Sequence, residues 1–95
     1  MKFMLSKIPL DLNKVKKEWL DREILRCGMI AELDAINLYE QLAAMTEDVN
    51  IKETLLDVAR EEKTHFGEFQ TLLLQKDKEQ VKELEGGRKE VEERK

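Results

Sequence analysis

Two long stretches of helix-compatible sequence most constrain the fold of this chain. The first runs from about residue 14 to residue 45, and the second from about residue 51 to residue 76. The segment TEDVN, residues 46–50, lies between them and is too short to be more than a connection. Because two long helices joined by a few residues form an antiparallel hairpin, we predict an all-α fold built on a two-helix hairpin.

Three segments are predicted along the chain. Residues 1–12 form an N-terminal arm, residues 13–85 the helical domain, and residues 86–95 a charged tail. The domain closes with a short C-terminal helix over about 79–85. We expect the following glycine pair to end this helix, because glycine is unfavourable in a helix interior.

Composition narrows the class of protein. A chain of 95 residues with 41% hydrophobic and 40% charged residues suits one soluble helical domain with narrow apolar stripes. Its net charge is −4, with no basic patch, so nucleic acid is not an expected partner. No apolar run reaches membrane-spanning length and no convincing signal peptide is present. We therefore expect no membrane association and a cytoplasmic location.

The first helix carries an unusually wide apolar arc with one carboxylate inside it. At about 100° per residue the arc covers roughly 200°, wider than one partner helix requires, so we expect burial on two sides. Glu32 falls near the middle of this arc, whereas Asp34 lies outside it and is expected at the surface. The arc consists of Ile24, Leu25, Cys27, Gly28, Met29, Ala31, Ala35, Ile36, Leu38, Tyr39, Leu42, Ala43 and Met45.

The second helix shows the same anomaly. Its apolar arc spans about 140° and contains Glu62 and His65, with Glu61 near its edge. His65 is the only histidine of the chain, and its spacing of three from Glu62 places both side chains on one helix face. The apolar members are Ile51, Leu55, Val58, Ala59, Phe66, Phe69, Leu72 and Leu73.

Three metal-competent side chains on two core-facing stripes favour a metal site. An unpaired buried carboxylate costs several kcal/mol, and a bound cation removes that cost. One Glu from one helix and Glu-x-x-His from another form half of the ligand set of di-iron carboxylate four-helix bundles. A two-fold dimer of hairpins would supply the other half, and two-fold dimers are the commonest oligomers.

Simpler interpretations of the same residues remain open. Glu62 and His65 could be a surface pair, and Glu32 could be a buried acid paired with an arginine. Tyr39 could be a packed core residue whose hydroxyl is satisfied, or it could serve the site from two turns beyond Glu32. The three polar residues could also form a buried network that fixes the register of a non-enzymatic dimerisation module.

The chain resembles the encapsulated ferritins, half-length ferritin-like proteins that accompany encapsulin shells. The resemblance covers roughly residues 22–85, through MIAELDAINLYEQLA and IKETLLDVAREEKTHFGEF. It implies a dimer that completes a ferritin-like four-helix bundle, with a di-iron site shared between two chains and Glu32, Glu62 and His65 as ligands from each. It also implies that Tyr39 lies near the site.

The function implied by the resemblance is that of a ferroxidase, which oxidises Fe(II) to Fe(III) with dioxygen. The resemblance further implies a ring of dimers, often a decamer, and iron storage in a surrounding encapsulin nanocompartment. In our leading hypothesis Glu62 bridges the two irons, while Glu32 and His65 are terminal ligands. Two alternatives are a di-iron peroxidase of rubrerythrin type and the non-enzymatic helical dimerisation module.

Overall fold

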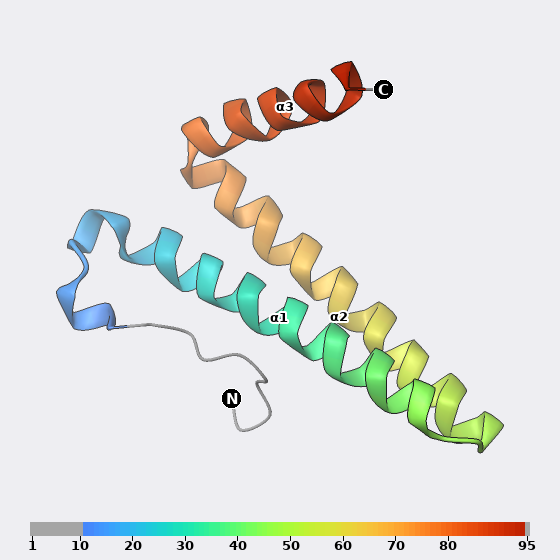
Figure 1. Ribbon diagram of the computed structural model, residues 1–95. Coiled ribbons are helices and arrows are strands. Elements are labelled where there is room, and N and C mark those ends of the chain that lie inside the picture. Colours follow the sequence, from blue (N-terminus) through green and yellow to red (C-terminus); the bar gives the residue numbers. More distant parts are fainter. Residues whose placement is uncertain (1–10, 95) are drawn as a thin grey trace.

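The computed structural model describes residues 11–94 and confirms the all-α prediction. Figure 1 shows α1 and α2 side by side and antiparallel, with α3 projecting at an angle from the end of α2. None of the helices among residues 11–94 is long and apolar enough to cross a lipid bilayer. The elements are η1 (Leu12–Lys14), η2 (Lys17–Trp19), α1 (Leu20–Met45), α2 (Val49–Lys76) and α3 (Lys78–Glu93).

Helix α1 begins at Leu20 rather than near residue 14. Lys16 takes an extended conformation (φ −59°, ψ 137°), which separates the two short 3-10 turns from each other. The N-terminus of a helix carries a partial positive charge, so lysines destabilise it and acidic residues stabilise it. The helix therefore starts just before Asp21 and Glu23, which occupy its first turn.

Small side chains let α1 and α2 approach closely. Ala43 and Ala59 are each only 2% exposed, and Gly28 lies against the ring of Phe69. A Cβ atom at Gly28 would sit 3.2 Å from two ring carbons of Phe69. At the tip of the hairpin, the Asp48 side chain caps α2 by accepting a hydrogen bond from the amide of Ile51 at 3.0 Å.

The buried face of α1 differs from the predicted arc. Asp34 was expected at the surface and is instead buried, beside the buried residues Ala35 and Ile36. Ile24 and Met45, which the arc placed in the core, are exposed. The hydrophobic period placed the apolar residues of α1 on one wide arc. It did not indicate which side of that arc packs against α2 within one chain.

Helix α3 continues through Gly86 and Gly87 to Glu93, so the predicted stop at the glycine pair is wrong. Each glycine costs about 1 kcal/mol in a helix relative to alanine. Side chains on both sides of the pair recover part of that cost. Arg88 donates to Glu85 at 2.5 and 3.0 Å and to Glu92 at 2.6 Å, which ties adjacent turns together.

Asp77 fixes the junction between α2 and α3. Its side chain accepts a hydrogen bond from the amide of Gln80 at 3.0 Å and another from Arg26 of α1 at 2.8 Å. The amide of Gln80, together with the guanidinium of Arg26, holds the pKa of the Asp77 carboxyl below its usual value. One nearly buried carboxylate thus caps α3 and links it to the first helix of the hairpin.

Candidate metal site

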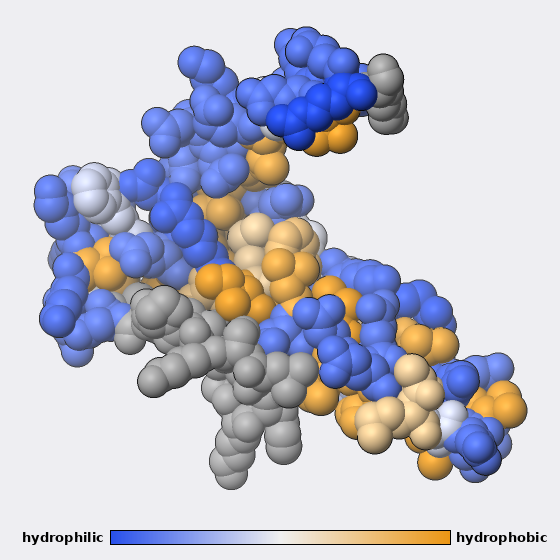
Figure 2. Space-filling view, viewed as in Figure 1, coloured by the Kyte–Doolittle hydropathy of each residue, from blue (hydrophilic) through white to orange (hydrophobic). Residues whose placement is uncertain are grey.

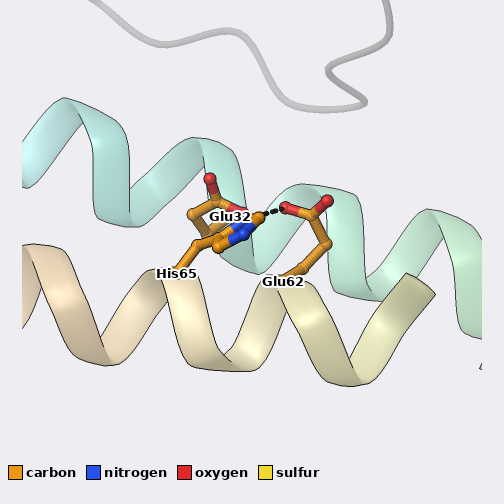
Figure 3. A group of neighbouring side chains, drawn as sticks. All are labelled: Glu32, Glu62 and His65. Atoms are coloured by element: carbon orange, nitrogen blue, oxygen red, sulfur yellow. Dashed lines mark hydrogen bonds and ion pairs between the residues drawn. The ribbon is translucent and has the colours of Figure 1, made fainter. Parts of the chain in front are cut away.

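Two facing helices bring together the three polar residues that interrupt the apolar stripes. Glu32 projects from α1, while Glu62 and His65 project from α2 one turn apart (Figure 3). The sequence spacing of three places Glu62 and His65 on one face, and the antiparallel packing brings that face to Glu32. Their ligand-competent atoms all lie within 4.8 Å of one another.

His65 stands between the two carboxylates. Its Nδ1 atom lies 3.4 Å from Oε2 of Glu62 and 3.6 Å from Oε2 of Glu32. Hydrogen bonds to carboxylates are normally shorter than this, at about 2.7–2.9 Å when both groups are charged. The three groups therefore surround a common point without closing into a tight hydrogen-bonded cluster.

One oxygen of Glu32 has no hydrogen-bond partner within the described chain. The Oε2 atom is fully buried and accepts no hydrogen bond from any residue between 11 and 94. Burial, together with the neighbouring Glu62 carboxylate, raises the pKa of Glu32 from 4.5 to about 7. His65 acts against this rise by favouring the charged form of Glu32. A polar atom left in this state is expected to receive a proton or a cation.

His65 forms the open side of the group. Its side chain is 46% exposed, against 14% for Glu32 and 19% for Glu62. Desolvation lowers the pKa of the imidazole, but the hydrogen bond with Glu62 and the charges of Glu32, Glu62 and Glu68 outweigh it and raise the pKa. The group thus holds an imidazole within a strongly negative environment at the edge of the hairpin.

The donor set fits a divalent cation of the first transition series. Two carboxylates and one imidazole suit iron, and they also suit manganese or zinc. A cation would supply the missing partner of Glu32 Oε2 and would neutralise the repulsion between the two carboxylates. Three donors are fewer than the four to six ligands that these ions usually take. The exposed side of His65 is therefore where further ligands would have to come from.

Two other residues considered from sequence lie on the same two helices. Tyr39 is half-buried on α1, two turns beyond Glu32, and Glu61 is exposed on α2. Glu61 does not belong to the set of converging carboxylate and imidazole atoms. Glu68 follows His65 by three residues, which places both side chains on the same helix face. Its charge contributes to the raised pKa of His65.

Comparison with known proteins gives three consistent matches. The Rubrerythrin family profile matches residues 23–95. A ferritin-like–encapsulin shell fusion protein of Pyrococcus furiosus is 60% identical over an alignment of 93 residues. The alignment covers 95% of this chain and 27% of the fusion protein. The chain thus spans about a quarter of that relative. The crystal structure of an encapsulated ferritin domain from Pyrococcus furiosus superposes with a TM-score of 0.80 and 56% identity, covering 94% of this chain and 93% of that one.

Proposed function

The chain belongs to the encapsulated ferritin family, within the wider rubrerythrin-like group, and we propose on that basis that it is a ferroxidase that oxidises Fe(II) to Fe(III) with dioxygen. The family suggests a di-iron oxidoreductase. The observation that carries the finer proposal is the group formed by Glu32, Glu62 and His65, with a buried carboxylate oxygen that lacks a hydrogen-bond partner. Iron is the redox-active partner that would pass electrons to dioxygen.

Each of the three residues contributes differently to holding iron. Glu32 supplies a buried negative charge whose cost in the metal-free protein is relieved when a cation arrives. Glu62, whose side chain is 19% exposed, supplies the second carboxylate. His65 supplies a nitrogen donor at the solvent-facing side, and it must be neutral to bind a metal.

A second copy of the chain completes the site in this proposal. One hairpin provides three donors and an open side at His65. A two-fold axis beside His65 would bring a second Glu32, Glu62 and His65 to the same place, which gives the six protein ligands of a di-iron carboxylate bundle. Each chain would then hold half of a ferritin-like four-helix bundle, and Tyr39 would lie near its centre without binding metal.

The experiment that tests the proposal is oxygen-dependent oxidation of Fe(II), followed by the absorbance of Fe(III). Glu32→Ala and His65→Ala are expected to reduce the initial rate to that of iron in buffer. Glu61→Ala provides the matched control, because Glu61 is an exposed carboxylate one residue from Glu62. Oxidation by Glu32→Ala at the wild-type rate would refute the assignment.

A di-iron peroxidase of rubrerythrin type is the second candidate. The Rubrerythrin profile covers residues 23–95, including all three candidate ligands. Separate stopped-flow reactions of the Fe(II)-loaded protein with peroxide and with dioxygen distinguish the two activities. A much faster reaction with peroxide would favour the peroxidase, and a faster reaction with dioxygen the ferroxidase.

We propose an encapsulin shell as the partner and a ring of dimers as the assembly. The fusion of a ferritin-like region to a shell protein in the Pyrococcus furiosus relative supports the first part. In this arrangement the protein works in a cytoplasmic encapsulin nanocompartment, as a ring such as a decamer, and Fe(III) is stored inside the shell. Co-expression with an encapsulin shell protein and analysis of purified shells for this chain test the association.

A further inference from the structure

Three polar residues of α2 lead from the core of the hairpin to its surface. In the stretch EKTHFGE, one glutamate precedes His65 by three residues and another follows it by three. Because three residues fall short of a full helical turn, each step also rotates by about a sixth of a turn in the same direction. The exposure follows this rotation. The Glu62 side chain is 19% exposed, the His65 side chain is 46% exposed, and Glu68 is an exposed residue.

The Glu68 carboxylate acts on the open side of His65. Side chains of an α-helix point back toward its N-terminus, so Glu68, which starts one turn after His65, reaches back toward it. Of the described residues, Glu32, Glu62 and Glu68 carry the charges that raise the pKa of His65. Glu61, an exposed glutamate one turn before His65, is not one of them. The imidazole therefore lies between two inner carboxylates and one outer carboxylate.

Glu68 keeps its negative charge outside any ion pair within the described chain. Figure 2 shows broad hydrophilic patches along the hairpin, where many charged side chains lie. Several of these charges are paired with a neighbour. Lys63 forms an ion pair with Glu40, and Arg60 forms one with Asp57. The Glu68 carboxylate is therefore available to a cation that arrives from solution.

A cation is attracted more strongly at each step from the surface inward. Water and salt screen the exposed carboxylate of Glu68, so it holds a cation only weakly. The two inner carboxylates are less solvated, and the Oε2 atom of Glu32 is fully buried without a hydrogen-bond partner. Electrostatic attraction grows as solvent is excluded. A cation that first meets Glu68 is thus drawn past His65 toward the inner pair.

We infer that Glu68 captures incoming Fe(II) beside His65 and releases it to the two carboxylates further in. This inference rests on the proposed function, because it takes the metal site as the destination of the ion. The step is a ligand exchange: carboxylate oxygens replace water molecules on the ion, no electron moves, and iron stays Fe(II). Since Glu68 does not hold the ion at its destination, its removal changes the rates of binding more than the final affinity.

The first test measures binding of Co(II) to the full metal-free chain, so that no oxidation intervenes. Rapid mixing at low ionic strength, followed by the visible absorbance of bound Co(II), gives the association rate. Glu68→Gln is expected to lower this rate about fivefold, because a charge at the rim of a site acts mainly on capture. Release of the ion slows as well, so the dissociation constant is expected to stay close to the wild-type value.

Two variants make this test specific. Glu61→Gln is the matched control, since Glu61 is an exposed glutamate of the same helix, and it is expected to bind Co(II) at the wild-type rate. Glu68→Lys is expected to slow association more than Glu68→Gln, because it repels the cation. Wild-type association by Glu68→Gln, or an equal loss in Glu61→Gln, would overturn the inference. So would a dissociation constant that rises as much as the association rate falls, because Glu68 would then be a ligand of the settled ion.

The second test uses the oxidation of Fe(II) over a range of iron concentrations. Glu68→Gln is expected to lower kcat/KM about fivefold and to leave kcat unchanged, because capture limits the reaction only when iron is scarce. Glu68→Asp keeps the carboxylate and is expected to recover most of kcat/KM. A lower kcat with unchanged kcat/KM would contradict capture. A wild type that binds Co(II) but does not oxidise iron would refute the ferroxidase alone, whereas one that binds no Co(II) would refute both proposals.

Discussion

Replacing Glu32 with glutamine is expected to stabilise the metal-free protein at pH 8 while it removes metal binding. Glutamine keeps the shape of the side chain but cannot ionise, so it avoids placing a charge on a fully buried oxygen that lacks a hydrogen-bond partner. It is also a much poorer ligand for a divalent cation than a carboxylate. The same substitution thus has opposite effects on the metal-free and the metal-bound protein.

The magnitude follows from the raised pKa of Glu32. The difference between 4.5 and about 7 corresponds to about 3 kcal/mol at alkaline pH. Below pH 4.5 the carboxyl is protonated in both the folded and unfolded states, and the penalty is absent. Stability is lost as the pH rises through 7, because the unfolded chain releases its proton first. Since the side chain keeps 14% of its surface in water, we expect a loss of about 2 kcal/mol between pH 5 and pH 8.

His65 changes stability in the same direction, because its pKa is raised in the folded protein as well. The stabilisation from its protonated form is complete below the pKa of an unfolded histidine and is lost as the pH rises through the folded value. The pKa of Asp77 is lowered, so its contribution is lost only at acidic pH, below the range used here. Between pH 5 and pH 8 the wild-type slope therefore reports mainly on Glu32 and His65.

Urea unfolding with a chelator, at fixed protein concentration and four pH values, measures this slope. The wild type is expected to lose stability steadily toward pH 8, and Glu32→Gln to keep only the smaller part due to His65. Glu61→Gln should behave like the wild type, because Glu61 is exposed. A Glu32→Gln protein with the full wild-type slope, or one less stable than the wild type at pH 8, would refute the reasoning.

Three further predictions concern packing, the α3 junction and metal binding. Gly28→Ala is expected to lower the free energy of unfolding by about 1 kcal/mol, since the new Cβ atom presses on Phe69. Gly67→Ala has open space around the new Cβ atom and should raise the free energy of unfolding by about 0.5–1 kcal/mol. Urea unfolding of both variants checks the contrast. Asp77→Ala is expected to lower the thermal midpoint by several degrees and to increase hydrogen exchange at the start of α3, which mass spectrometry can locate. A divalent metal should raise the wild-type midpoint more at pH 8 than at pH 6, because its ligands must be deprotonated, as differential scanning calorimetry would show.

The three candidate ligands could be predicted from sequence because helical periodicity is a strong local signal. Glu32 and the pair Glu62 and His65 each interrupt an apolar arc, and the structure brings them together. The distances from His65 to the two carboxylates could not be predicted. They depend on the rotation of α1 against α2, which close contacts such as Gly28 with Phe69 determine. Sequence period indicates that a residue faces inward but not which atom lacks a partner.

The ends of the helices were harder to predict because side-chain contacts decide them. Helix propensity favours a stop at Gly86 and Gly87, yet Arg88 links the turns on both sides of the pair. Helix propensity also favours a start near residue 14, yet the positive charges of the lysines near that position destabilise a helix N-terminus there. In both cases charged groups bear on where the helix begins or ends, and the intrinsic helix propensity of single residues does not include their effect.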